Sequence, residues 1–73
     1  MSKVAIYPGT FDPITFGHID VIKKSLRLFK KVIVAVSDGE NKKYLFSVDE
    51  RIEIVKKALF SDLKLSRKKI NVI

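Results

Sequence analysis

Two short apolar runs without polar alternation constrain the fold of this chain most. Val4–Tyr7 ends at Pro8-Gly9, and Lys31–Val36 ends at a turn-forming stretch that starts at Ser37. Such runs are typical of strands in a parallel sheet that is covered on both faces. Parallel strands need a long crossover, which is usually a helix. The first half of the chain therefore predicts a strand-helix-strand unit.

Helical periodicity fills the space between the two runs and resumes after the second. Between Ile19 and Lys31, apolar residues recur at helical spacing opposite a charged side. They are Ile19, Ile22, Leu26 and Phe29. A second helix is predicted from Ser47 through Phe60, because Ser47 and Glu50 can form a capping box. Its apolar positions are Val48, Ile52, Val55 and Leu59.

The segment Ile70–Ile73 begins a third predicted strand. The order β-α-β-α-β predicts an α/β fold with a Rossmann-like parallel sheet, which ends in or after its third strand. Right-handed crossovers in strand order 3-2-1 place both helices on one face of such a sheet. We therefore expect the second face to be covered by polypeptide beyond residues 1–73, which would be downstream chain, a partner, or a second copy.

Composition limits the classes of function. The 73 residues suffice for one small domain. Fifteen Lys+Arg against eight Asp+Glu give a net charge of +7, which favours anionic partners, although scattered lysines do not by themselves indicate a nucleic-acid site. The absence of Cys and the single His exclude disulfides and a zinc site of thiolates or imidazoles. No apolar stretch has the length of a membrane span, so we expect a soluble cytoplasmic protein without a membrane partner.

The junction from Pro8 to His18 is the candidate site. It lies at the carboxyl end of a predicted parallel strand, where open α/β sheets bind their ligands, and it leads into a helix whose first amides favour an anion. Gly9 can let the chain turn tightly, and Gly17 can let a phosphate approach the main chain. Thr15 is the predicted N-cap, which places His18 beside the free amides. These residues predict a phosphate-binding junction.

Other interpretations of the same residues stay open. Neither the dinucleotide fingerprint G-x-G-x-x-G nor the P-loop pattern occurs in the chain. A lone His near a helix start is often a surface or capping residue. Asp12-Pro13 is an ordinary turn pair, and Lys42-Lys43 would in most loops be a solvated pair of charges.

At these residues the chain resembles a known family. The stretch Tyr7–Asp20 is similar to the amino-terminal signature of bacterial phosphopantetheine adenylyltransferases, and it includes the T/H-x-G-H motif of nucleotidylyltransferases as Thr15-Phe16-Gly17-His18. The resemblance continues through Lys42–Phe46 and Ser47–Arg51 and covers essentially all 73 residues. Because members of this family are longer, the resemblance implies that residues 1–73 form the amino-terminal half of a single nucleotidylyltransferase domain.

The resemblance implies transfer of AMP from ATP to 4′-phosphopantetheine, which yields dephospho-coenzyme A and pyrophosphate in coenzyme A biosynthesis. It implies that His18 and Lys42 are catalytic, His18 by stabilising the charge-rich transition state and Lys42 by drawing the acceptor phosphate toward the α-phosphate. The implied ATP-binding residues are Thr10, Phe11, Gly17 and His18, and the implied acceptor-binding residues are Thr10 and Lys42. Mg²⁺ would arrive with ATP, without a metal ligand from the protein, and the family implies a homo-oligomer.

Two positions depart from the family pattern, and two alternatives remain. Phe16 stands where the family commonly has a small polar residue, and Tyr44 stands where Pro is common. One alternative is another T/H-x-G-H nucleotidylyltransferase with a different phosphorylated acceptor. The other is a basic fragment without catalytic activity that binds nucleotide, nucleic acid or a partner chain, although we do not expect nucleic acid as a partner.

Overall fold

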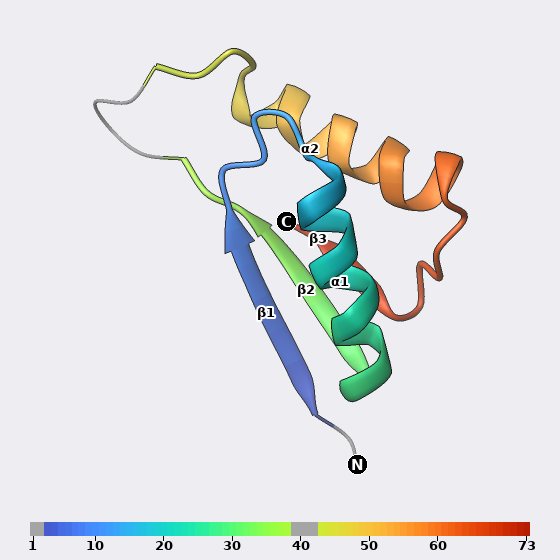
Figure 1. Cartoon of the computed structure of the whole chain (residues 1–73). Coiled ribbons are helices and arrows are strands. Elements are labelled where there is room, and N and C mark those ends of the chain that lie inside the picture. The colour runs from blue at the N-terminus through green and yellow to red at the C-terminus, as the bar shows by residue number, and fades with distance from the viewer. Residues whose placement is uncertain (1–2, 39–42) are drawn as a thin grey trace.

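The computed structural model describes residues 3–38 and 43–73, which form a three-stranded sheet with helices packed against it (Figure 1). Its elements are β1 (Val4–Gly9), α1 (Phe16–Leu28), β2 (Lys31–Val36), α2 (Val48–Lys56), the π-helical segment η1 (Lys57–Asp62) and β3 (Ile70–Val72). Each predicted helix and strand is present, and η1 extends the second helix past Phe60. Within the described residues, no helix combines the length and apolar character that crossing a membrane requires.

The three strands form one parallel sheet in the order β1-β2-β3. Ile33 in the central strand pairs with Ile6 on one side and Asn71 on the other. Gly9 pairs with Val36, so β1 and β2 end level with each other. The chain segments that leave these strands therefore start at one edge of the sheet, at the arrowheads in Figure 1. This confirms the predicted α/β class and its parallel sheet.

Side-chain caps fix where both α-helices begin. The Thr15 hydroxyl accepts from the His18 amide, and the His18 side chain accepts from the Thr15 amide. Ser47 and Glu50 make the same reciprocal pair at the start of α2. Each cap satisfies amides that a helix start otherwise leaves without partners. Both predicted caps are confirmed, and α1 begins at Phe16, before its first apolar stripe residue.

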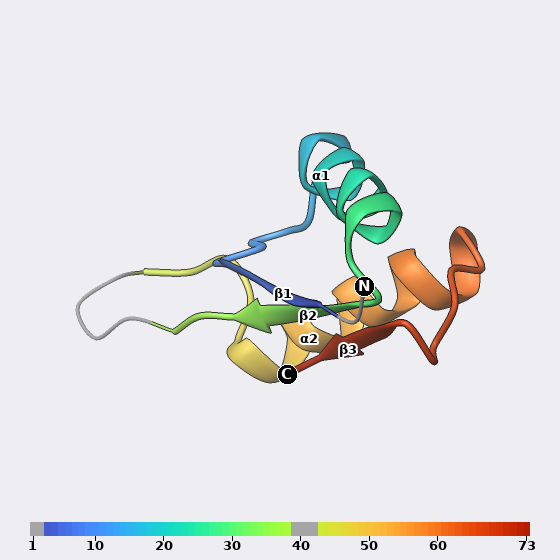
Figure 2. The same cartoon turned by 90° about the horizontal axis from the view of Figure 1, so that it is seen from below.

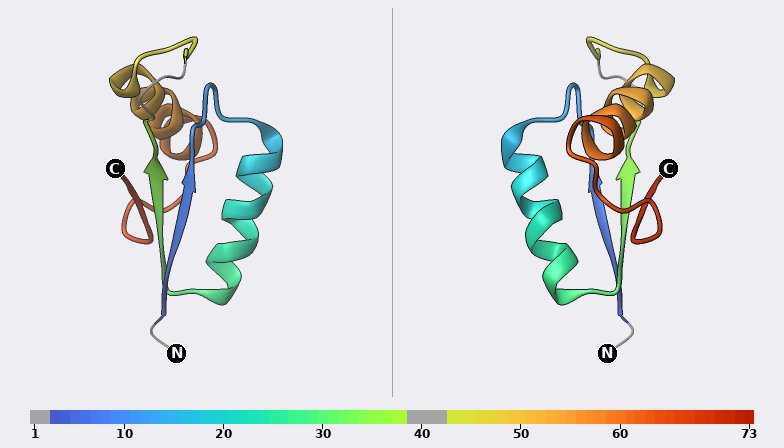
Figure 3. Two further views of the ribbon diagram at one scale, coloured as in Figure 1. Left: turned by 90° about the vertical axis from the view of Figure 1, so that its left-hand side faces the viewer. Right: turned by 90° about the vertical axis from the view of Figure 1, so that its right-hand side faces the viewer.

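Both helices cover the same face of the sheet. One hydrophobic core receives Ile22 from α1, Val55 from α2 and Leu59 from η1. The strands contribute to this core through alternate residues, of which the buried ones are Val32, Val34, Ile70 and Val72. Figure 2 shows that α1 lies on one side of β1 and β2, and Figure 3 shows that it runs along these two strands. The predicted placement of both helices on one face is thus present.

The opposite face of the sheet is open in the described part of the chain. Val4 is 54% exposed and Ile6 is 66% exposed, although both are apolar residues of β1. The apolar runs predicted strands covered on both faces, whereas residues 3–38 and 43–73 cover only one. An open apolar sheet face favours association with further polypeptide.

Phe11 anchors the loop that follows β1. Its side chain is completely buried, and its backbone lies in the left-handed region with a φ of 48°. The ring packs so closely against Gly9 that a Cβ atom there would lie 2.9 Å from Phe11 Cζ. No glycine among the described residues has a positive φ. Gly9 is therefore needed for its small size and not, as we predicted, for a special turn conformation, which falls on Phe11 instead.

We expect Gly9→Ala to destabilise the chain by roughly 1–3 kcal/mol, because the added methyl group would displace a buried aromatic ring. Gly17→Ala is the matched control, since a methyl group added there would lie 3.6 Å from its nearest neighbour, Thr15 Oγ1. That control should stabilise helix α1 by about 0.4–1 kcal/mol. Urea unfolding followed by circular dichroism measures both. Equal changes in the free energy of unfolding for the two substitutions would show that the Phe11 ring can move aside for the methyl group without loss of stability.

Candidate active site

The candidate site lies where β1 ends and α1 begins. Thr10 and Phe11 follow the strand directly, and Gly17 and His18 belong to the first turn of the helix. The structure therefore brings these four sequence-predicted residues together at the carboxyl edge of the sheet. Ligands of open α/β sheets bind at this edge.

The His18 imidazole is held by its helix cap in one orientation and one tautomer. Thr15 N donates to His18 Nδ1 at 3.0 Å, and Thr15 Oγ1 lies 3.1 Å from the same nitrogen. A backbone N–H can only donate, so Nδ1 presents its lone pair and the proton of the neutral ring sits on Nε2. None of the hydrogen bonds within the described residues uses Nε2. His18 therefore offers an N–H donor to a ligand.

Aromatic contacts fix the position of the same ring. The His18 and Phe11 ring centroids are 4.8 Å apart with the planes at 72°, an edge-to-face contact. The Phe11 and Tyr7 rings make a second edge-to-face contact at 5.5 Å. Because Phe11 is fully buried, this row of rings ties the imidazole to the end of β1.

The first turn of α1 is suited to an anion. It contains no acidic residue, and Thr15, Phe16 and Gly17 are all exposed. The cap uses the amide of His18, and none of the described hydrogen bonds uses the amides of Phe16 or Gly17. Free amides at a helix start combine with the helix dipole to attract negative charge. The His18 Nε2–H donor belongs to the same turn.

Asp12 joins the β1–α1 loop to the segment that precedes α2. Its two carboxylate oxygens accept from the backbone amides of Leu45 at 2.6 Å and Phe46 at 3.0 Å. More than thirty residues separate the carboxylate from these amides along the chain. Asp12 is thus more than the ordinary turn residue that the Asp-Pro pair suggested, because it positions a second segment beside the site.

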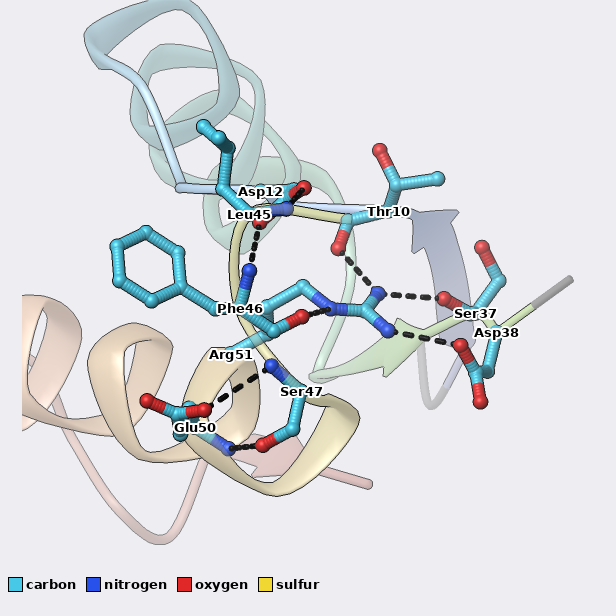
Figure 4. Close-up of polar contacts among 9 residues, drawn as sticks. All are labelled: Thr10, Asp12, Ser37, Asp38, Leu45, Phe46, Ser47, Glu50 and Arg51. Atoms are coloured by element: carbon cyan, nitrogen blue, oxygen red, sulfur yellow. Dashed lines mark hydrogen bonds and ion pairs between the residues drawn. The ribbon is translucent and has the colours of Figure 1, made fainter. Parts of the chain in front are cut away.

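Arg51 is the main polar contact between these segments (Figure 4). Its guanidinium is completely buried and donates from Nη1 to Thr10 O at 2.9 Å and Ser37 O at 2.8 Å. Nε donates to Phe46 O at 3.1 Å, and Nη2 pairs with Asp38 Oδ1 at 2.9 Å. One side chain therefore binds the ends of both β1 and β2 and the approach to α2.

The sequence pattern did not single out Arg51 or the bridging role of Asp12. A signal for Arg51 was present, because it lies three residues after Val48 and four before Val55 and so falls on the buried stripe of its helix. A cation on an apolar stripe indicates a buried partner set. Nothing comparable marked Asp12, whose partners are backbone amides distant in sequence.

Two sequence expectations are not settled at this edge. Lys42, expected to be catalytic and to bind the acceptor, lies outside the described residues. The described residues contain no group of three or more His, Cys, Asp or Glu side chains that could hold a metal ion.

Known proteins match this chain in sequence over most or all of its length. It is 70% identical to the phosphopantetheine adenylyltransferase of Pelagibacter ubique over 73 residues, which is 100% of this chain and 44% of that protein. It is 64% identical over 58 residues to the phosphopantetheine adenylyltransferase of Campylobacter hominis, 80% of this chain and 36% of that protein. The chain thus spans less than half the length of these relatives.

Solved structures match the fold. A bifunctional NMN adenylyltransferase/ADP ribose pyrophosphatase from Francisella tularensis, complexed with AMP and Mn ion, superposes with a TM-score of 0.83 at 24% identity, over 100% of this chain and 22% of that one. The Plasmodium falciparum nicotinic acid mononucleotide adenylyltransferase, complexed with NaAD, gives a TM-score of 0.81 at 27% identity. The match covers 100% of this chain and 37% of that one. The β-α-β-α-β arrangement is therefore part of larger nucleotidyltransferase structures.

A family model settles the assignment. The cytidylyltransferase-like model matches residues 6–72, a range that includes the whole loop after β1, helix α1 and Arg51. Since this match leaves out only the first few residues and the last, the chain belongs to the cytidylyltransferase-like family.

Proposed function

We propose that the chain is the amino-terminal half of a phosphopantetheine adenylyltransferase domain. The complete domain would transfer AMP from ATP to 4′-phosphopantetheine and release dephospho-coenzyme A and pyrophosphate. The observation that carries this proposal is the 70% identity, along the entire chain, to a relative that bears this enzyme's name. The anion-suited first turn of α1 supports it independently.

The reaction needs positioning and charge stabilisation more than covalent chemistry by the protein. An oxygen of the acceptor phosphate attacks the α-phosphorus of ATP in line, and the bond from that phosphorus to pyrophosphate breaks. Negative charge is spread over the phosphate oxygens in the transition state. Fixed N–H donors aimed at those oxygens lower the barrier, because they need no reorganisation during the reaction.

The described residues supply such donors. His18 Nε2–H would donate to a phosphate oxygen in the transition state, since Nδ1 is engaged by Thr15. The amides of Phe16 and Gly17 and the main chain at Thr10–Phe11 would contact ATP. The Thr10 side chain would orient the acceptor phosphate.

Two further parts of the proposal depend on groups outside the described residues. Lys42 would draw the acceptor phosphate toward the α-phosphate, as a flexible ammonium group can. Mg²⁺ would enter on the phosphates of ATP as part of the substrate, as the family resemblance implies. We place the reaction in the cytoplasm, as we expected from the sequence, and in a homo-oligomer, as the family resemblance implies.

The rest of the domain would cover the open face of the sheet. The chain spans 44% of its Pelagibacter relative, and the apolar side chains of Val4 and Ile6 are exposed on that face. Burying them would contribute to joining the two halves, at about 25 cal/mol for each Å² removed from water. This accounts for an apolar strand surface that residues 3–38 and 43–73 leave open.

A complementation assay tests the proposed function. The 73-residue chain is mixed with a polypeptide that corresponds to the remaining length of the Pelagibacter relative, and pyrophosphate release from ATP is measured with 4′-phosphopantetheine. We expect release above the sum of the separate polypeptides. Release with nicotinic acid mononucleotide but not with 4′-phosphopantetheine would favour the alternative acceptor, and salt-sensitive binding of duplex nucleic acid without nucleotide binding would favour the binding-only alternative.

Ile6→Lys should abolish most of the complemented activity, because it would bury an unpaired ammonium group where the two halves meet. Leu28→Lys is the matched control, since Leu28 is 76% exposed near the end of α1 and the substitution is chemically similar. The control should keep the activity of the unmodified chain. Full activity of the Ile6→Lys mixture would contradict the proposal that this face is covered.

The role proposed for His18 is separable from its cap. In the complemented assay, His18→Ala and His18→Asn should each lower turnover by roughly 10²–10³-fold, because both remove the donor at Nε2. Asn can still accept from the Thr15 amide through its side-chain oxygen, so only the Ala variant should also lose helix stability, by about 1 kcal/mol. Steady-state kinetics and thermal unfolding are measured on the same samples. Unchanged turnover in the Asn variant would remove Nε2 from the mechanism.

A further inference from the structure

We infer that Arg51 is a positioning residue for nucleotide binding, which acts by fixing the direction of the Phe11 amide and the Thr10 side chain. The inference rests on the proposed function, because it concerns how the same site holds ATP. Arg51 itself is completely buried, and its donors are engaged by protein acceptors. Its effect on a ligand therefore has to pass through the main chain that it binds.

The peptide group between Thr10 and Phe11 carries this effect. Arg51 Nη1 donates to Thr10 O at 2.9 Å, so that carbonyl points toward the guanidinium. In a trans peptide the C=O and the following N–H point in opposite directions, and Thr10-Phe11 is not a cis bond. The Phe11 N–H is thus directed away from Arg51. None of the hydrogen bonds within the described residues uses it.

The Thr10 side chain faces the same outer side. Figure 4 shows it on the side of the main chain opposite the guanidinium. Phe11 holds a left-handed φ of 48°, which costs energy in a residue other than glycine and persists only where the surroundings enforce it. The hydrogen bond from Arg51 to Thr10 O and the burial of the Phe11 ring together enforce this φ. The loop is therefore preorganised to present an N–H and a hydroxyl.

The same nitrogen of Arg51 also sets the spacing between two strands. Nη1 donates to Ser37 O at 2.8 Å as well as to Thr10 O, so the residues that follow β1 and β2 are held against one atom. Ser37 N also donates to Gly9 O at 2.8 Å, which is a second link between the ends of β1 and β2. The loop after β1 cannot shift without breaking these contacts.

Only an arginine can make this set of contacts. The guanidinium donates to three carbonyl oxygens and one carboxylate in fixed directions, and its Cζ lies 4.0 Å from the centroid of the Tyr44 ring. A lysine would keep the charge but has three donors on one atom, which cannot span these acceptors. Arg51→Lys is therefore the substitution that separates geometry from charge.

The test is an ATP titration of the isotopically labelled 73-residue chain mixed with the complementing polypeptide of the activity assay, followed by the backbone amide signals of the labelled chain in NMR. In the unmodified chain, the Phe11 amide should shift on ATP binding. In Arg51→Lys, this signal should already be displaced without ATP, and ATP affinity should fall by roughly tenfold, which is the effect of about one hydrogen bond with a charged group. Arg27→Lys, the same change at an exposed position of α1, is the control and should bind as the unmodified chain does.

A second variant decides the question if Arg51→Lys lacks the dispersed signals of a folded chain. Asp38→Ala removes one guanidinium partner at a side chain that is 57% exposed, and should weaken ATP binding by about twofold to fivefold. If Arg51→Lys is folded and binds ATP with the affinity of the unmodified chain, the inference is wrong. If Arg51→Lys is unfolded, the same result in Asp38→Ala overturns it. In either case the proposed function is unaffected. Absence of any ATP-dependent shift in the unmodified chain mixed with the complementing polypeptide would instead contradict the proposed function, and the inference with it.

Discussion

The candidate site depends on one buried guanidinium. The fully buried side chain of Arg51 donates to the carbonyl oxygens of Thr10, Ser37 and Phe46, and Asp38 pairs with its charge. Removing the guanidinium would leave these backbone acceptors without their donor, and an unpaired buried acceptor costs about 1–3 kcal/mol, a large part of the stability of so small a domain. The ends of two strands and the start of α2 therefore hold together or come apart as a unit.

The cap of α1 links this scaffold to the chemistry. His18 Nδ1 accepts from Thr15, and the imidazole packs edge-to-face on the buried Phe11 ring. Phe11 in turn belongs to the loop whose backbone Arg51 grips. A donor nitrogen, a free helix start and a loop amide are thus placed by a continuous set of contacts, with Asp12 fixing the neighbouring segment through two amides.

Features that depend on local sequence could be predicted. The caps at Thr15 and Ser47, the strands and the α/β order all follow from residues close together in the chain, and all are confirmed. The residues Thr10, Phe11, Gly17 and His18 were predicted to form a site, and their shared edge of the sheet follows from parallel pairing, while their roles stay predictions. The periodicity and the loop residues predicted only a phosphate-binding site, and the family resemblance was needed to predict adenylyl transfer as its function.

Features that depend on distant contacts could not be predicted. Asp12 binds backbone amides more than thirty residues away, which leave no trace in residue types. The place of Arg51 on the buried stripe of its helix indicated a buried partner set but not that its partners are the carbonyl oxygens of Thr10 and Ser37. The open face of β1 could be predicted from topology, because two right-handed crossovers place both helices on the other face of the sheet. The apolar sequence of the strand, taken by itself, indicated that both faces are covered.

The most direct measurement is a crystal structure of the chain with a non-hydrolysable ATP analogue. Our account predicts the analogue at the carboxyl edge of the sheet, with a phosphate oxygen within hydrogen-bond distance of His18 Nε2 and of the first amides of α1. An analogue bound instead at the opposite end of the strands, in the pocket lined by Val4, Lys30, Lys31, Lys68 and Lys69, with the His18 Nε2 donor unused, would contradict it.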